Sequence, residues 1–305
     1  MTKLRVVLMS VLLLAGTGIG YAQSSNLSHK KALEIQQRTL LVPIAAKKSK
    51  NDEVFEQLVK KYWKFNEQVE FVSHKKAAAM LKKNKGKYAL LGYSLFVDRT
   101  TTRRRNPAYN GMNSKYNKDS YVSNTIQTLV VWLTDKKGSI KVNLSRKYSL
   151  ERNTIYGLQH LQYLLNYLVA DSKHKSLMTF YKRQIKKNAP ELKQKTLLID
   201  EKLLAKKLKR AKIKDYYPYP HKIVKTGAVE QALKEQNADY AFIHIASIDY
   251  GQGAMNIHFV SNAATGKIYL YLAAKVGMPS IAGIKLHNNR NIGKKQLKKY
   301  AKRLK

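Results

Sequence analysis

The sequence contains the same succession of apolar runs twice, and this duplication constrains the possible folds more than any other feature. The run TLLV at 39–42 recurs as TLLI at 196–199, and YALL at 88–91 recurs as YAFI at 240–243. The runs occur in the same order in each copy, with matching helical patterns between them. We therefore expect two tandem copies of one structural unit rather than a chance similarity of short strands.

Each copy continues with a hairpin and an amphipathic helix. The hairpins are expected at 129–144 and 257–272, because strand-like runs flank a short turn containing glycine in both. Apolar residues then recur at helical spacing over 155–168 and 292–304. The unit is thus β-α-β-α-β-β-β-α. The predicted fold class is α/β (α+β-like), in which each unit is a mixed sheet with an antiparallel hairpin and helices packed on it.

The length of 305 residues suits two such units. We predict the first repeat at 38–188, after a lead-in segment at 23–37, and the second repeat at 195–305. Pro190 is expected to end the long helix between them, since proline cannot donate the backbone hydrogen bond that a continuing helix needs. Only a short polar linker follows, so the two units are expected to pack against each other.

Residues 1–22 have the pattern of a secretory signal peptide. Two basic residues precede an apolar run at 6–15, and small residues at Gly20 and Ala22 suit cleavage after Ala22. A transmembrane anchor is the alternative, but the apolar run is shorter than the roughly 20 residues that a span needs. We therefore predict an exported chain, periplasmic or extracellular, with no transmembrane span after cleavage. Because the sequence has no cysteine, it excludes disulfides and lipid attachment to an N-terminal Cys.

Two stretches of the second copy resemble a known envelope domain. They are NADYAFI at 237–243, which begins a strand, and FVSNAATGKI at 259–268, which is a strand followed by a turn. The pattern is similar to that of the N-terminal α/β domain of TolB and the periplasmic domain of CsgG-type secretion lipoproteins. The resemblance implies this fold and a non-catalytic role in assembly with other envelope components. Asn262 stands where the family usually has aspartate, and the β-propeller of TolB and the lipidated cysteine of CsgG have no counterpart.

The segment at 98–123 in the first copy is the strongest candidate for a contact site. It is rich in Arg, Asn, Gly and Tyr, lacks periodicity, and corresponds to only five residues, 249–253, in the second copy. Arginine suits carboxylates and phosphates, and tyrosine suits stacking or rigid contacts. The alternative is a solvated hairpin extension with no ligand. The predicted partner- or polyanion-binding residues are Arg99, Arg103, Arg104, Arg105, Tyr109, Lys115, Tyr116, Lys118 and Tyr121.

A secondary contact surface is predicted in the aromatic and proline-rich run 215–221, at Tyr216, Tyr217 and Tyr219. Such a run forms a stiff, amphipathic surface that suits carbohydrate or protein. The alternative, which we favour, is that two prolines set a turn while the tyrosines cover the edge of the core, because half-buried tyrosines are common. The matching place in the first copy holds YWKF at 62–65, which supports a packing role.

The chain is strongly basic, with 58 Lys and Arg against 19 Asp and Glu and a formal net charge of +39. Such a charge attracts polyanions, which outside the cytoplasm include acidic polysaccharides and lipid phosphates. The alternative is a solvated lysine face with no ligand. Because an exported protein does not meet intracellular nucleic acid, we do not expect it to bind any. The expected partner is an envelope protein or a polyanionic surface, and self-association is left open.

Support for an enzyme is weak. The best candidate is Asp200 with Glu201, which ends a predicted strand where ligands bind in open α/β sheets. His244 and His258 lie on neighbouring predicted strands and could approach each other, although such a pair without a carboxylate more often fills a sheet face than binds zinc. We therefore predict a non-enzymatic binding or scaffolding module that acts through 98–123, with no cofactor and no metal. A polyanion binder is the alternative, and a hydrolase-like enzyme is the least favoured hypothesis.

Overall fold

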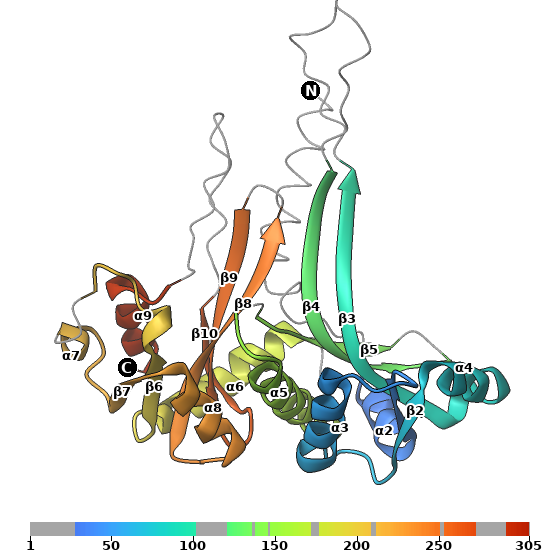
Figure 1. The fold of residues 1–305 in the computed structure, drawn as a ribbon. Coiled ribbons are helices and arrows are strands. Elements are labelled where there is room, and N and C mark those ends of the chain that lie inside the picture. Colours follow the sequence, from blue (N-terminus) through green and yellow to red (C-terminus); the bar gives the residue numbers. More distant parts are fainter. Residues whose placement is uncertain are drawn as a thin grey trace, which may run out of the picture.

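The computed structural model describes residues 28–101, 121–135, 138–145, 147–171, 177–208, 212–250, 253–272 and 291–304. They form two five-stranded mixed sheets with helices packed on them (Figure 1). The strand orders are β2-β1-β3-β4-β5 and β7-β6-β8-β9-β10, so the second sheet repeats the first strand for strand. The predicted α/β class with two tandem units is therefore confirmed. The signal peptide predicted at 1–22 lies outside the described residues.

The two units have the same order of elements along the chain. The first unit follows α2 (His29–Gln37) and consists of β1 (Thr39–Ile44), α3 (Lys50–Tyr62), β2 (Val69–Ser73), α4 (His74–Lys83), a 3-10 turn (Lys85–Lys87), β3 (Tyr88–Thr101), β4 (Tyr121–Leu133), β5 (Ser139–Asn143) and α5 (Leu150–Ala170). The second unit follows α6 (Leu177–Leu192) and consists of β6 (Thr196–Asp200), a 3-10 turn (Glu201–Leu203), α7 (Ile213–Tyr216), β7 (His221–Val224), α8 (Thr226–Lys234), β8 (Tyr240–Tyr250), β9 (Gly253–Asn262), β10 (Ile268–Leu272) and α9 (Lys294–Leu304).

Each sheet is built around a short, buried parallel strand. β1 pairs in parallel with β2 and β3, and β6 pairs in parallel with β7 and β8. Both strands are almost wholly buried, as their continuous apolar sequences predict. The other pairs, β3–β4–β5 and β8–β9–β10, are antiparallel. This mixture is the one that the repeated sequence pattern predicts.

Helix α5 lies between the two units and joins them into one core. Ten consecutive residues, 152–161, are buried. On one side Gly157 approaches Leu129 of β4 so closely that a Cβ atom would lie 2.9 Å from a Leu129 methyl carbon. On the other side the ring of Tyr156 stacks on His244 of β8, with centroids 3.8 Å apart. A continuous apolar cluster therefore spans both units, which agrees with the packing that the short linker predicts.

Two expectations about local structure are wrong. Pro190 does not end the helix before it, because it lies inside the last turn of α6, which continues to Leu192. Proline fits helical φ angles and removes one hydrogen bond, and the fully buried Leu192 holds the turn against the core. The segment 98–123 is also not a loop over its whole length as its lack of periodicity predicts, because β3 extends to Thr101 and β4 begins at Tyr121.

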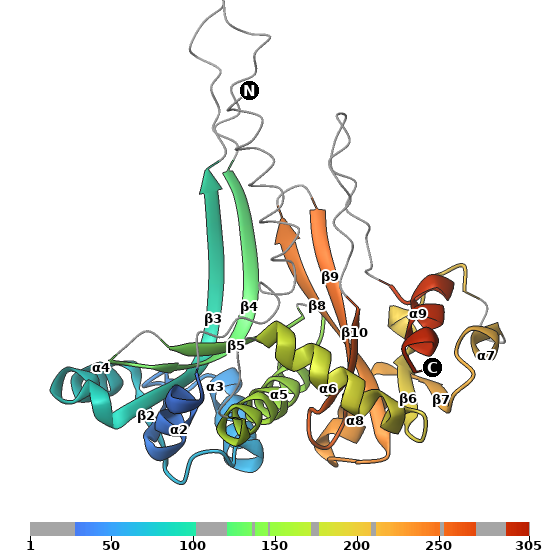
Figure 2. The same cartoon turned by 180° about the vertical axis from the view of Figure 1, so that it is seen from behind.

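Seen from behind, α6 runs across β10 and leads into the second unit (Figure 2). The two antiparallel hairpins, β3–β4 and β8–β9, leave the body in the same direction, and β3–β4 is the longer (Figures 1 and 2). In the described part of the chain, every helix is too short or too polar to span a bilayer.

Candidate functional site

The carboxyl end of β1 marks the candidate site. In the order β2-β1-β3 the chain leaves β1 for β2 on one side and then crosses to β3 on the other. The connecting helices lie on opposite faces of the sheet, because α3 packs on the face of Leu40 and Val42 while α4 packs on the face of Leu41 and Leu90. In open α/β sheets such a reversal leaves a crevice at the carboxyl ends of the strands, and ligands bind there.

A cleft of about 570 Å³ occupies this position, which is a volume typical of small-ligand pockets. We call it the open cleft. Its described lining residues include no lysine or arginine, which is unusual in a chain with 58 of them. The lining residues are Pro43, Asn51, Asp52, Phe55, His74, Ala77, Ala78, Leu81, Leu90, Gly92, Tyr93, Trp132 and Leu150.

The polar rim of the open cleft is set by helix caps. Ser49 caps α3 in a capping box, in which its backbone N–H and its hydroxyl both donate to Oδ2 of Asp52, at 2.9 and 2.7 Å. These hydrogen bonds lower the pKa of the Asp52 carboxyl, and the nearby His74 imidazole lowers it further. Ser73 caps α4, so His74 is the first residue of that helix. The rim therefore holds one fixed carboxylate beside one imidazole.

The apolar wall of the open cleft is aromatic. The Tyr93 hydroxyl forms a hydrogen bond with the Thr154 hydroxyl of α5, and the Tyr93 ring lies 5.0 Å from that of Phe55. Burial raises the pKa of Tyr93 to about 12, so it stays protonated at neutral pH. Trp132 of β4 is half-buried and its ring lies over Gly92, where a Cβ atom would stand 3.7 Å from the ring. Because both rings are held by neighbours, the wall is preformed.

The equivalent crevice of the second unit is filled. We call it the filled crevice, and its occupant is Arg152 from α5. The Arg152 Nη1 atom donates to Oδ2 of Asp200 at 2.9 Å, and Nη2 donates to the Ile243 carbonyl at 3.3 Å. The guanidinium carbon lies 3.7 Å from the centroid of the Tyr148 ring. The side chains of Arg152 and Asp200 are 0% and 2% exposed, so this ion pair is excluded from water.

Asp200, the best candidate for an active-site residue, is fully occupied by contacts within the protein. Oδ1 of Asp200 also accepts hydrogen bonds from the Thr226 hydroxyl at 3.1 Å and from the Lys202 backbone at 3.0 Å. Both carboxylate oxygens are thus committed to the protein itself. Asp200 serves as a structural partner for Arg152, whose position 48 residues earlier in the other copy gave no signal in the sequence.

The suggestion that His244 and His258 approach each other is wrong. His258 pairs with Ile245 in the β8–β9 ladder, one position away from His244, so the two side chains point to opposite faces. His244 stacks on Tyr156 of α5, and Nδ1 of His258 lies 2.5 Å from the Tyr300 hydroxyl of α9. Burial, and then the charge of Arg152, lower the pKa of His244 well below its usual value. No group of metal-ligating side chains occurs among the described residues.

The predicted contact segment 98–123 is carried by a two-stranded ribbon. β1 pairs with β3 only as far as Leu90, and β5 pairs with β4 only from Thr128 onwards. Seven pairs beyond them, from Leu95–Gln127 to Thr101–Tyr121, join β3 and β4 alone and extend roughly 20 Å at 3.3 Å per residue. Arg99 and Tyr121 lie on these strands. Outside the described residues lie Arg103, Arg104, Arg105, Tyr109, Lys115, Tyr116 and Lys118.

The tyrosines of the predicted secondary surface pack mainly against the protein. Tyr217 is fully buried, and its ring meets those of Tyr219 and His221 edge-on at 5.5 and 6.0 Å. Tyr216 and Tyr219 are half-buried against the core of the second unit. Tyr217 is therefore a core residue, as the packing alternative predicts.

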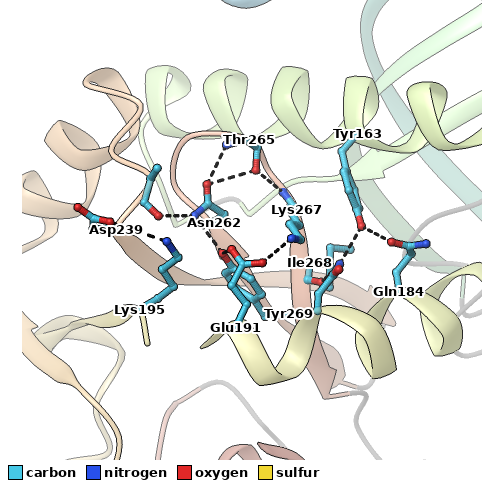
Figure 3. A network of polar contacts seen from close by, with 12 residues as sticks. Tyr163, Gln184, Glu191, Lys195, Asp239, Asn262, Thr265, Lys267, Ile268 and Tyr269 are labelled. Atoms are coloured by element: carbon cyan, nitrogen blue, oxygen red, sulfur yellow. Dashed lines mark hydrogen bonds and ion pairs between the residues drawn. The ribbon is translucent and has the colours of Figure 1, made fainter. Parts of the chain in front are cut away.

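A further polar network lies between α6 and β10 and is structural (Figure 3). Oδ1 of Asn262 accepts from the backbone N–H groups of Ala264 and Thr265 at 3.0 and 3.1 Å, which closes the β9–β10 turn. Glu191 accepts a hydrogen bond from the Tyr269 hydroxyl at 3.0 Å and forms an ion pair with Lys267. Asn262 thus acts as the capping residue of this turn.

Comparison of the chain with protein-family models, with curated proteins and with solved structures finds no match.

Proposed function

We propose that this protein is an exported, non-enzymatic binding module that contacts a protein partner through the Arg- and Tyr-rich segment 98–123. The observation that carries the proposal is the β3–β4 ribbon. Its strands pair continuously from Ala89–Leu133 to Thr101–Tyr121, so the ends of the segment stand away from the core on a defined register. Arginine and tyrosine are among the residues that contribute most to protein interfaces.

The base of the ribbon is held firmly, which favours a presenting role. A two-stranded ribbon is marginally stable in water unless its base is part of a larger sheet. Here β3 is paired on both sides at Leu90, by β1 and by β4. Just above this point the Tyr93 hydroxyl ties β3 to Thr154 of the central helix α5. The ribbon is therefore anchored in the core that the two units share.

A second candidate function, binding of a polyanion, is favoured by the exposed face of α9. Five lysines follow one another on this face with helical spacing, and they line a shallow groove of about 440 Å³. Two of them, Lys294 and Lys298, lie over the Tyr216 ring at 5.1 and 5.7 Å. The five lysines are Lys294, Lys295, Lys298, Lys299 and Lys302.

Two triple variants separate the two functions. Arg103, Arg104 and Arg105 are replaced by alanine in one, and three α9 lysines (294, 298 and 302) are replaced by alanine in the other. Both variants lose the same charge. The mature protein and both variants are used to capture partners from an envelope extract at about 50 and 500 mM salt, because binding to a polyanion weakens steeply with salt.

A defined protein that is retained at high salt by the wild type and the lysine variant, and lost by the arginine variant, is the expected result. The proposal fails if only polysaccharide, lipid or DNA is captured, if salt releases all of it, and if the two variants lose binding equally. That result would mean that the net charge itself is the function.

A further inference from the structure

The open cleft and the filled crevice occupy equivalent places in the two units. The last β1–β3 pair is Leu41–Leu90, and the last β6–β8 pair is Leu198–Phe242. The strands separate beyond these pairs, which opens a crevice at the carboxyl end of β1 and β6. In the second unit this space holds the Arg152 guanidinium. The described residues of the first unit place no side chain of this kind in the open cleft.

The registers show how the two places differ. Counting from the paired residues, Pro43 corresponds to Asp200, and Gly92 corresponds to His244. Trp132 corresponds to Ser261, since these residues pair with Leu90 and Phe242. At the base of the crevice the first unit therefore lacks the carboxylate and the imidazole that the second unit has. In their place it has open space at Gly92 and the aromatic ring of Trp132 beside it.

The open cleft also has a carboxylate and aromatic rings, the groups that bind a cation, but they come from other positions. Asp52, on the first turn of α3, replaces the carboxylate that β6 supplies in the second unit, and Ser49 holds it ionised. Trp132 and Tyr93 supply aromatic surface. The described lining includes no lysine or arginine, and His74 is its only basic side chain. A planar guanidinium satisfies both features, because it pairs with carboxylates and stacks on aromatic rings.

We propose that the open cleft binds an arginine side chain presented by a partner polypeptide, with Asp52 as its counter-ion and Trp132 as its aromatic face. The chain itself supplies the precedent, because Arg152 reaches the equivalent place between a carboxylate at 2.9 Å and an aromatic ring at 3.7 Å. The cleft and the β3–β4 ribbon share the edge of the sheet at which β1 ends. The open cleft is separate from the segment 98–123, so this proposal does not depend on whether that segment binds a partner.

The two tryptophans of the chain allow a direct test. Trp63 is buried, and its indole N–H donates to Asn66 at 2.9 Å, so its NMR signal serves as an internal control. The probe is N-acetyl-arginine amide, titrated at pH 8, where histidine is uncharged. The control probe is N-acetyl-citrulline amide, which has nearly the same shape and no charge. We expect the Trp132 indole signal to shift saturably with the arginine probe alone, while the Trp63 signal does not move.

Three variants complete the test. Asp52→Asn removes the counter-ion and is expected to weaken binding about fivefold or more, as the loss of a charge-assisted hydrogen bond predicts. Glu53→Gln removes the same charge from the neighbouring residue, which does not line the cleft, and is expected to leave binding within twofold. Gly92→His introduces the residue of the second unit and is expected to abolish binding. Its thermal unfolding midpoint shows whether it remains folded.

The proposal is overturned by any of three results: no saturable shift, an equal response to citrulline amide, or unchanged binding in a folded Gly92→His variant. The first would mean that the cleft has no affinity for arginine. The second would mean that the charge is not recognised, and the third would place the binding elsewhere on the protein.

Discussion

Replacing Arg152 by methionine tests whether the two units are held together by the buried ion pair. The substitution keeps most of the side-chain volume and leaves the Asp200 carboxylate at 2% exposure without its cationic partner. Removing one member of a buried pair typically costs about 3–5 kcal/mol. Asp200 retains hydrogen bonds from Thr226 and from the Lys202 backbone, so we expect about 3 kcal/mol, at the lower end of that range.

The double variant Arg152→Met with Asp200→Leu sharpens the test. Replacing a whole buried pair by apolar residues of similar volume is often neutral, because neither charge has to be desolvated. The Nε atom of Arg152 has no hydrogen-bond partner among the described residues, which adds to the cost of burying it. We therefore expect the double variant to be more stable than either single variant, with a coupling free energy of about 2–3 kcal/mol.

The measurement is urea unfolding followed by circular dichroism at pH 7.5 for the wild type, both single variants and the double variant. A loss of about 3 kcal/mol is a large part of the 5–15 kcal/mol that a folded protein usually has, so it is easily resolved. The slope of the unfolding free energy with urea concentration reports whether both units still unfold together. A single-variant cost below about 1 kcal/mol, or strictly additive effects, would refute the view that the pair is dry and mutually dependent.

Other variants and conditions test the packing around this interface. Burial lowers the pKa of His160 to about 4 and that of His244 in the same direction, so the unfolded chain binds more protons below pH 6.5. Stability should therefore fall as the pH drops from 6.5 towards 4, with about 3 kcal/mol from His160, and urea midpoints at several pH values measure this loss. Gly266→Ala should cost more than about 2 kcal/mol, because Gly266 has φ of +66° and a Cβ atom would lie 2.7 Å from the backbone of α5. Gly227→Ala on α8 has open space and should stabilise by about 0.5–1 kcal/mol, which thermal melting compares directly. Tyr217→Phe should be neutral or slightly stabilising in the same assay, because the buried hydroxyl has no hydrogen-bond partner in the described part of the chain.

The repeated fold was predictable because its signal is local and occurs twice. Continuous apolar runs identify the buried parallel strands, and the Gly266 turn places the second hairpin. The outer parts of β3 and β4 were missed for a physical reason. Beyond Leu95 these strands pair only with each other, and their sequences, FVDRTT at 96–101 and YVSNTI at 121–126, lack the alternation of apolar and polar residues that identifies a strand.

The candidate site was less predictable, because its residues become neighbours only through the strand order. Asp52, His74 and Trp132 come from three separate elements, and none belongs to a motif. The rule that ligands bind beyond strand ends directed attention to Asp200, which lies at the filled crevice. The same rule applied to β1 indicates Pro43, whose apolar side chain does not predict a binding site.

The difference between the two crevices follows from how a tandem pair is built. Helix α5 ends the first unit in sequence, yet Arg152 near its start fills the crevice of the second unit. In the described chain, no helix that precedes the first unit fills its crevice in this way. The helix α2 precedes it, but α2 packs on α5. Helix α9 holds the place in the second unit that α5 holds in the first, and its exposed face carries five lysines. Duplication thus leaves the two equivalent crevices in different states, one filled by Arg152 and one open, so the open cleft joins the segment 98–123 and the α9 lysines as a surface on which a partner can bind.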